Sequence, residues 1–169
     1  MAQQTILGWL EAAMTSYQIR RATTQDITAL VDFNRRLAWE TEDRELDLEV
    51  LTQGVTRAFA QGDEALYFVA DHESSCVGSL MLTREWSDWR DGWLVWIQSV
   101  YVLPEHRTKG VFKALLHRAT THVEDDPDCI GLRLYVENKN DRAQAVYARS
   151  GFVDPSYRVL EKILPQQGD

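Results

Sequence analysis

The most informative segment of the chain reads Asn140-Asp-Arg-Ala-Gln-Ala-Val-Tyr-Ala-Arg-Ser-Gly-Phe152. It predicts a helix that begins at Asn140, because asparagine often caps a helix N-terminus. Gly151 is predicted to end this helix, since glycine readily adopts the left-handed conformation of a C-terminal cap. Phe152 follows where a hydrophobic contact would close that cap. The segment therefore indicates a short helix with a definite start and a definite end.

Three residues of this helix have a spacing that places them on one face. Asn140, Ala143 and Tyr147 stand at positions i, i+3 and i+7 of the helical repeat. One interpretation is that the amide, the small side chain and the phenol line a common groove. The other is that Asn140 is only a helix cap and Tyr147 only an aromatic residue at the edge of the core. The segment taken alone leaves both interpretations open.

A second segment, Val100–Leu116, combines the end of an apolar strand, a short basic loop and the start of a helix. A helix N-terminus presents N–H groups without intrahelical partners and the positive end of the helix dipole, which together bind phosphate. Arg107, Lys109 and Lys113 add positive charge, and Gly110 allows the backbone to approach an anion closely. The segment predicts a phosphate-binding loop, although a basic loop that merely precedes a helix would have the same pattern.

The rest of the chain predicts one α+β domain. Trp93–Leu103 is almost continuously apolar, which is typical of a strand buried on both faces, so we expect it to be the central strand. Arg84–Gly92 is expected to be a loop, and residues 1–16 a separate N-terminal extension, either a short helix or disordered. The other expected strands are Tyr17–Arg21, Ala65–Ala70, Cys76–Thr83, Cys129–Val136 and Tyr157–Ile163, and the other expected helices begin at Thr23 or Thr24, at Asp47 and at Gly110.

The composition restricts the classes of partner. The formal charge of −8 argues against a nucleic-acid surface, which needs clustered Lys and Arg, and suits a small cationic substrate or a basic peptide. No apolar run approaches the roughly 20 residues that span a bilayer, and the N-terminus lacks the pattern of a secretory signal. We therefore expect a cytoplasmic protein without a membrane partner, in which Cys76 and Cys129 are buried, unpaired thiols.

Together the two segments resemble the two motifs of the GNAT superfamily of N-acetyltransferases. The cofactor motif, Gln/Arg-x-x-Gly-x-Gly/Ala, is matched by Arg107 and Gly110, with Phe112 in place of the last small residue. The second motif, Asn-x-x-Ala-x-x-x-Tyr-x-x-x-Gly-Phe, is complete in Asn140–Phe152. The resemblance extends over most of the chain. It implies a single domain over residues 17–165 with an α/β/α layered fold, in which about four helices flank a mixed central sheet of six to seven strands.

The resemblance also implies acetyl-CoA as the cofactor. The backbone of Val100, Tyr101 and Val102 would pair with the pantetheine arm as an added strand does. Asn140 and Ala143 would contact the arm from the other side, and Tyr147 would protonate the departing thiolate. The pyrophosphate would be held by backbone N–H groups at Arg107, Thr108, Lys109, Gly110, Val111, Phe112 and Lys113. Because Phe112 replaces a small residue, we expect this loop to hold its ligand with a different local fit.

The acceptor side is less well defined. An aliphatic amine must lose a proton when it attacks a thioester, but Trp93–Leu103 contains no carboxylate, and its Gln98 cannot act as a base. Glu40 and Glu42, which follow the first long helix, are the predicted bases, unless this acidic turn is simply solvated. The side chains predicted to contact the acceptor are those of Trp39, Glu40, Glu42, Trp86, Trp89 and Gln98, which would form an aromatic and acidic pocket for a cation.

The sequence therefore predicts an N-acetyltransferase without a metal site that modifies a primary amine of a small molecule or a peptide. It is expected to be a monomer or a homodimer. A catalytically silent acyl-CoA-binding sensor module is the alternative, because it would retain both motifs. A homo-oligomeric scaffold that uses exposed tryptophans for its contacts is a third possibility.

Overall fold

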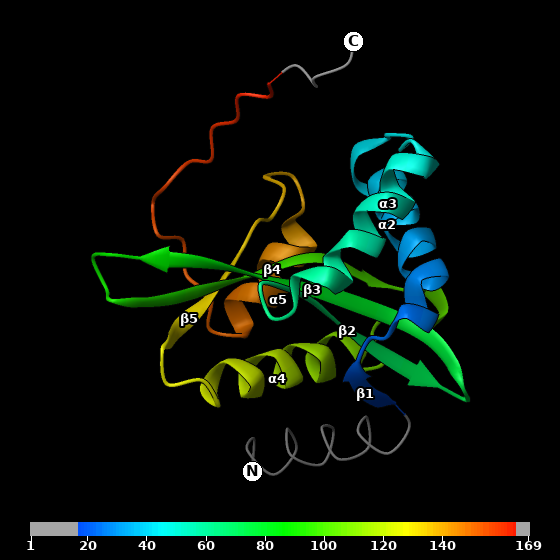
Figure 1. Cartoon of the computed structure of the whole chain (residues 1–169), viewed down its shortest axis with the longest axis horizontal. Helices are drawn as coiled ribbons and strands as arrows, with labels where there is room; N and C mark the ends of the chain where they lie inside the picture. Colours follow the sequence, from blue (N-terminus) through cyan, green and yellow to red (C-terminus); the bar gives the residue numbers. More distant parts are fainter. Residues whose placement is uncertain (1–16, 165–169) are drawn as a thin grey trace. The chain divides into compact units, whose positions relative to one another are not determined.

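A computed structural model of the protein describes residues 17–164, whose helices and strands are shown in Figure 1. The predicted N-terminal extension, residues 1–16, lies outside the described residues. The chain forms two compact units that divide between Tyr135 and Val136. The first contains β1 (Gln18–Arg21), η1 (Thr24–Asp26), α2 (Ile27–Glu42), α3 (Leu48–Ala58), η2 (Phe59–Gln61), β2 (Ala65–His72), β3 (Ser75–Ser87), β4 (Gly92–Val102), η3 (Pro104–His106), α4 (Val111–Glu124) and β5 (Cys129–Leu134). The second contains α5 (Asp141–Arg149).

The five strands of the described chain form one sheet in the order β1-β2-β3-β4-β5. The first three pairings are antiparallel, and β4 pairs with β5 in parallel. The last pairing is parallel because α4 lies between these strands in the sequence and returns the chain to the same end of the sheet. The predicted central strand, β4, therefore has a neighbour on both sides, although it is fourth in the order rather than third.

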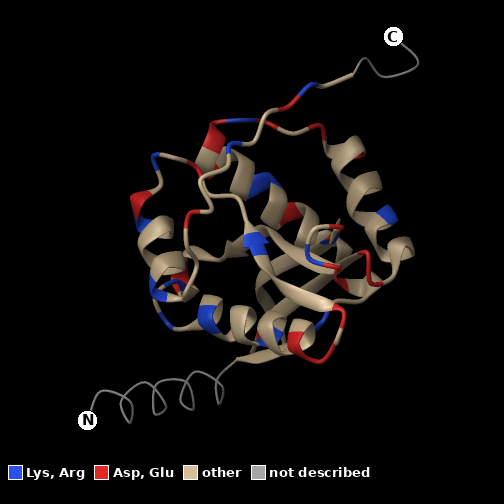
Figure 2. Cartoon of the chain, turned by 90° about the vertical axis from the view of Figure 1, so that its left-hand side faces the viewer, with Lys and Arg blue, Asp and Glu red and all other residues tan. Residues whose placement is uncertain are grey.

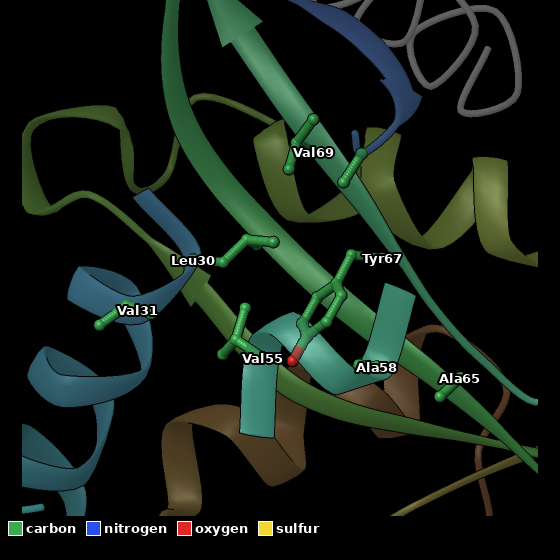
Figure 3. Close-up of a cluster of buried hydrophobic side chains, with 8 residues drawn as sticks. Leu30, Val31, Val55, Ala58, Ala65, Tyr67 and Val69 are labelled. Carbon is green, nitrogen blue, oxygen red and sulfur yellow. The ribbon is translucent and has the colours of Figure 1, made fainter. Parts of the chain in front are cut away.

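Helices cover both faces of the sheet, as alternate residues of β2 show. Tyr67 and Val69 belong to a buried cluster with Leu30 of α2 and Val55 of α3 (Figure 3). Phe68 points the other way, where its ring centroid lies 5.6 Å from that of His122 in α4. Burial of each such apolar side chain contributes roughly 1.5–3 kcal/mol. The helices α2 and α3 thus share one face, the α2 face, and α4 covers the other, the α4 face. The predicted layered α+β fold is confirmed.

The predicted helix starts in this unit are also confirmed. Thr23 and Asp26 form a capping box, in which the Asp26 carboxylate accepts a hydrogen bond from the Thr23 N–H at 2.7 Å. Buried Asp26 also pairs with Arg20 of β1 at 2.7 Å. Asp47 caps α3 through a hydrogen bond from the Val50 N–H at 2.9 Å. Side chains that satisfy the first N–H groups of a helix define where it begins.

The prediction of a loop over Arg84–Gly92 is wrong for its first half. The strand β3 continues through this region to Ser87 and leaves only a short turn before β4. A cross-strand contact stabilises the extension, since the rings of Trp86 and Trp93 lie 5.0 Å apart in an edge-to-face arrangement. Aromatic pairs of this kind stabilise a two-stranded ribbon. The polar composition of the segment therefore did not prevent strand formation.

The prediction of a final strand at Tyr157–Ile163 is wrong as well. The structure assigns no helix or strand to residues 152–164, and the side chain of Leu160 is 91% exposed. Alternating apolar residues make a segment compatible with a strand, but a strand is stable only when a neighbour completes its hydrogen bonds. Residues 17–164 accordingly contain five strands rather than six to seven, while their four α-helices agree with the predicted number.

Candidate active site

The strand β4 contains an irregularity at Ser99. Ser79 of β3 pairs with Tyr101, and Met81 pairs with Gln98, so that one residue of β3 lies opposite two of β4. This arrangement is a β-bulge. Ser99 has a φ of 49°, in the left-handed region that few residues other than glycine adopt. The bulge turns backbone polar groups out of the regular ladder at this point.

The sheet opens beside the bulge. Pairing between β4 and β5 ends at Ile97 and Leu134, whereas β4 continues to Val102 and pairs there with β3 alone. Among residues 17–164, no strand completes the hydrogen bonds on the other edge of Gln98–Val102. An edge of this kind can accept an extended ligand as an additional strand. It includes Val100, Tyr101 and Val102, where the family resemblance places the pantetheine arm.

The loop after β4 leads into a helix N-terminus that has no side-chain cap. Thr108 and Gly110 have positive φ values of 65° and 89°, and Gly110 is the N-cap of α4. Asp47 and Asn140, in contrast, cap α3 and α5 with their side chains. The first turn of α4 therefore presents N–H groups and the positive end of a helix dipole to any anion placed there.

Two lysines of this region carry no counter-charge. Lys109 and Lys113 are exposed, and no carboxylate among residues 17–164 forms an ion pair with either. Figure 2 shows charged residues of both signs on the helices and turns, while most of the strands are uncharged. In a chain with a net charge of −8, a local excess of positive charge beside the α4 N-terminus is well suited to phosphate.

Glu40 of α2 reaches the same loop. Its Oε2 accepts a hydrogen bond from Arg107 Nη2 at 2.6 Å, and its Oε1 accepts one from Tyr101 Oη at 2.6 Å. Arg107 Nε also donates to the Val102 carbonyl at 2.8 Å. The guanidinium lies over the Tyr101 ring, 5.3 Å from its centroid. These contacts join the end of α2 to the end of β4 and to the start of the loop.

The same contacts set the ionisation of both partners. Burial acts to raise the pKa of Glu40, but the hydrogen bonds from Tyr101 and Arg107 outweigh it and hold the pKa below its ordinary value. The pKa of Tyr101 is raised, first by burial and then by the neighbouring carboxylate. Glu40 is therefore an anion and Tyr101 a neutral donor at neutral pH, which are the states that this hydrogen bond needs.

Glu42 does not join this group. It lies two residues after Glu40, which corresponds to a rotation of roughly 200° around the helix. Because Glu40 points toward β4, Glu42 faces away from it and is exposed. Of the two carboxylates predicted as bases, the structure thus brings Glu40 to the loop that follows β4 and leaves Glu42 in solvent.

Side-chain alternation divides the predicted acceptor residues between the two faces of the sheet. Gln98 pairs with a β3 residue that packs against the α2–α3 cluster, so it lies on the α2 face. Trp86 pairs with Trp93, which is five residues before Gln98, and both therefore point to the α4 face. Trp89, in the β3–β4 turn, is 85% exposed, and Trp39, in α2, is 60% exposed. The tryptophans are not gathered around one pocket.

An aromatic and charged cluster on the α2 face was not predicted. Glu85 accepts hydrogen bonds from Trp96 Nε1 and from Arg133 Nη1, the latter at 2.9 Å. The Trp96 ring stacks on Tyr135, with centroids 4.4 Å apart. The cluster lies next to the last β4–β5 pair. Glu85 was missed because its segment was predicted to be a loop. The only sequence signal for the cluster was a single arginine, Arg133, within an apolar strand.

The second unit has the helix ends that the sequence predicts. Asn140 Oδ1 accepts a hydrogen bond from the Ala143 N–H at 3.0 Å and is therefore the N-cap of α5. At the other end Gly151 has a φ of 88°, and the Phe152 N–H donates to the Tyr147 carbonyl at 3.1 Å. This bond closes a Schellman cap, and the rings of Tyr147 and Phe152 lie 5.9 Å apart.

The Tyr147 hydroxyl is held in its neutral form. Burial raises the pKa of Tyr147 above its ordinary value, because a phenolate is poorly solvated inside a protein. The group consequently keeps its proton throughout the neutral range, as a proton donor must.

Residues 25–152 match the model of the acetyltransferase (GNAT) family. The chain belongs to this family. The matched range includes the bulged strand β4, the loop that leads to α4, and α5 as far as Phe152. Both segments that carried the resemblance therefore lie inside the region that defines family membership.

Two relatives of this GNAT chain differ in how specifically they are named. Streptothricin acetyltransferase A of Bacillus subtilis is 26% identical over 121 residues, which are 72% of this chain and 61% of that protein. An uncharacterised N-acetyltransferase of Mycobacterium tuberculosis is 36% identical over 83 residues, 49% of each chain. The chain thus spans about three fifths of the first relative and about half of the second.

Solved structures share the fold over most of the chain. A possible acetyltransferase from Clostridium difficile has a TM-score of 0.82 and 38% identity, and the match covers 89% of this chain and 99% of that one. A predicted acetyltransferase from Clostridium acetobutylicum, solved with acetyl-CoA, has a TM-score of 0.71 at 18% identity, with 86% and 96% covered. At that identity the second match shows the fold alone.

Proposed function

We propose that this GNAT protein transfers the acetyl group of acetyl-CoA to a primary amine of a small molecule or a peptide. The observation that carries the proposal is the path from the open edge of Gln98–Val102 to the uncapped N-terminus of α4. The edge suits an extended arm that contains amides, and the helix N-terminus suits a pyrophosphate. Acetyl-CoA has both groups and supplies the acetyl group as a thioester.

The related proteins support this donor and leave the acceptor open. The Clostridium acetobutylicum structure was solved with acetyl-CoA. Streptothricin acetyltransferase A is named for streptothricin, and a glucosamine-6-phosphate N-acetyltransferase from Arabidopsis thaliana, which shares the fold at 17% identity, is named for a different acceptor. A shared fold does not select an acceptor, because acceptor contacts come from side chains that vary between relatives.

In the proposed reaction the backbone of β4 and the side chain of Tyr147 act on opposite ends of the bond that breaks. N–H groups that the bulge at Ser99 turns out of the ladder polarise the thioester carbonyl. As the amine forms the C–N bond and the C–S bond breaks, Tyr147 gives its proton to the sulfur. Its raised pKa preserves that proton until the thiolate forms. Asn140 and Ala143 would contact the arm, as the family resemblance implies.

The proton of the attacking amine needs a separate acceptor, and we propose that water carries it to Glu42, because this carboxylate faces away from β4 and cannot reach the amine directly. The Glu40 carboxylate already accepts two hydrogen bonds, and its lowered pKa makes it a poor base. Glu42 is exposed and free to take a proton and pass it to solvent. Glu42→Gln should therefore alter the dependence of the rate on pH. A pH profile identical to that of the wild type would remove Glu42 from the mechanism.

The acceptor is proposed to approach on the α2 face, beside Trp39 and Gln98. A net charge of −8 favours a cationic amine and disfavours nucleic acid. Trp86 and Trp89, on the β3–β4 hairpin, would contact only a longer acceptor such as a peptide. No helix among residues 17–164 has the length and apolar character needed to cross a membrane. A cytoplasmic location and a monomeric or homodimeric state are parts of the same proposal.

The test measures thiol release from acetyl-CoA in the presence of a panel of primary amines and peptides. The enzyme proposal expects at least one amine to accelerate release and to appear as its acetylated product. Coenzyme A binding without acceleration by any amine would instead support the acyl-CoA-binding sensor, which Phe112 and the lack of a carboxylate in β4 favour. Absence of coenzyme A binding would overturn both.

A further inference from the structure

Glu40, Tyr101 and Arg107 form a three-residue contact that the transfer reaction itself does not require. We propose that Glu40 is a positioning residue, which holds Arg107 in place and thereby shapes the loop Arg107–Gly110 for the pyrophosphate of the cofactor. This inference rests on the proposed function, because it assigns the pyrophosphate to that loop. It gives Glu40 a task at the donor side rather than the acceptor side.

The Nε–Nη2 edge of the Arg107 guanidinium, which could otherwise bind a phosphate, is directed toward the protein. Its Nε donates to the Val102 carbonyl and its Nη2 to Glu40, at 2.8 and 2.6 Å. Tyr101 covers one side of the guanidinium plane. Bidentate recognition of an anion uses two parallel N–H groups, and here both groups of the Nε–Nη2 edge are already engaged. Arg107 is therefore fixed as a support for the loop.

The loop needs such a support because little else holds it. Thr108 has a φ of 65°, an unfavourable conformation for a residue with a side chain. Neither Thr108 nor Lys109 makes a side-chain hydrogen bond within the described residues. Fixed points lie on both sides, at Arg107 and at Val111, which is 1% exposed. The direction of the N–H groups between them depends on how firmly Arg107 is held.

The environment of Glu40 matches a support better than a base. Each of its two oxygens accepts a hydrogen bond of 2.6 Å, one from Tyr101 and one from Arg107. These two hydrogen bonds stabilise the ionised carboxylate and so make its remaining lone pairs less basic. Its partners lie on β4 and on the loop, so the carboxylate joins α2 to both of them.

Coenzyme A binding by isothermal titration calorimetry tests the inference without any acceptor. Glu40→Gln retains the shape of the side chain but removes its charge, and it should raise the dissociation constant about threefold to tenfold, the range for a partly exposed charge-assisted contact. Tyr101→Phe should raise it about twofold to threefold. Glu45→Gln is the matched control, because it removes the same charge from an exposed side chain that follows the same helix. It should leave the constant unchanged.

A double-mutant cycle separates positioning from a general structural effect. Once Arg107 has been replaced by Gln, the further change Glu40→Gln should have no additional effect on coenzyme A binding, because Glu40 acts through Arg107. In turnover with a saturating amine, Glu40→Gln should raise KM for acetyl-CoA and leave kcat within about twofold of the wild type. A variant that was merely less stable would not raise KM for acetyl-CoA while leaving kcat nearly unchanged, nor would its effect on coenzyme A binding disappear once Arg107 has been replaced.

Several outcomes would overturn the inference alone. The inference fails if Glu40→Gln binds coenzyme A as tightly as the wild type or more tightly. It also fails if the two substitutions have strictly additive effects in the cycle, or if Glu40→Gln lowers kcat without changing KM. The last result would return Glu40 to the role of a base. If the wild type does not bind coenzyme A at all, the proposed function fails together with the inference.

Discussion

Gly78 of β3 lies where the end of β4 and the start of α4 both pack closely against its backbone. A Cβ atom at this position would lie 3.0 Å from the Tyr101 carbonyl oxygen and 3.3 Å from methyl groups of Val102 and Val111. The first of these atoms belongs to the backbone and cannot rotate away. Gly78→Ala therefore requires β3 and β4 to move apart by a few tenths of an ångström. The first residue of α4, Val111, must also move away slightly.

The expected cost follows from this geometry. Forcing an additional methyl group into a close-packed site costs about 1–3 kcal/mol. For a chain of this size, 1 kcal/mol corresponds to about 2–4 °C in melting temperature, so Gly78→Ala should melt about 2–12 °C below the wild type. Since the displaced residues Tyr101, Val102 and Val111 form the proposed cofactor site, coenzyme A binding should also weaken.

Gly54 provides a control of opposite sign. It lies inside the helix α3, where a Cβ atom would meet no atom within 4 Å. Gly54→Ala should therefore stabilise the protein by about 0.5–1 kcal/mol, because alanine loses less backbone freedom in a helix. Thermal melts followed by circular dichroism measure both variants. A Gly78→Ala protein that melts at or above the wild-type temperature would refute the close contact deduced for the β3–β4–α4 junction.

Three further predictions concern single side chains. Tyr147→Phe should lower kcat by about 10²-fold or more while coenzyme A still binds, whereas Tyr157→Phe, at an exposed position of the second unit, should have no effect; equal rates for the two variants would exclude Tyr147 as the acid. The hydrogen bond from Arg20 holds the pKa of Asp26 below its ordinary value, so ionised Asp26 contributes stability above about pH 4 that is lost as the pH falls through its folded-state pKa. Asp26→Asn should lower the free energy of unfolding by about 1–3 kcal/mol at pH 7 and reduce the fall in melting temperature between pH 5 and pH 3. A variant whose melting temperature falls as much as that of the wild type over this range would contradict the prediction. Ser99→Val should destabilise the bulge by about 1–3 kcal/mol, because a β-branched residue strongly resists a positive φ, while Ser99→Gly should be neutral or stabilising; the melting temperatures of the two variants decide.

The parts of the fold that could be predicted depend on interactions between near neighbours in the sequence. Asp47 and Asn140 bond to N–H groups three residues ahead, and Gly151 supplies a conformation that its own lack of a side chain permits. Helix caps of this kind can be recognised in a short stretch of sequence, and the helices that begin or end at them were predicted. The motif Asn140–Phe152 belongs to the same class, since its cap and its helical face are local.

The parts that could not be predicted depend on strand pairing. Tyr157–Ile163 has the alternation of a strand but no strand partner within residues 17–164, and the region after Arg84 became a strand because its residues meet partners in β4. The contact between Glu85 and Arg133 joins positions 48 residues apart, and that between Glu40 and Arg107 joins positions 67 apart. Contacts of that range follow from register, and composition carries little information about register.

The bulge at Ser99 shows how one local irregularity determines the site. Without it, strict alternation from Gln98 on the α2 face would place Tyr101, three residues later, on the α4 face. The extra residue shifts the register by one and turns Tyr101 to the α2 face, where its ring lies 5.4 Å from Phe33 and its hydroxyl reaches Glu40. The bulge that we propose to present backbone N–H groups to the thioester thus also creates the contact between Tyr101 and Glu40, which in turn holds Arg107. A substitution that removes the bulge should therefore weaken coenzyme A binding at the pyrophosphate loop as well as slow the transfer, because both depend on the direction in which Tyr101 points.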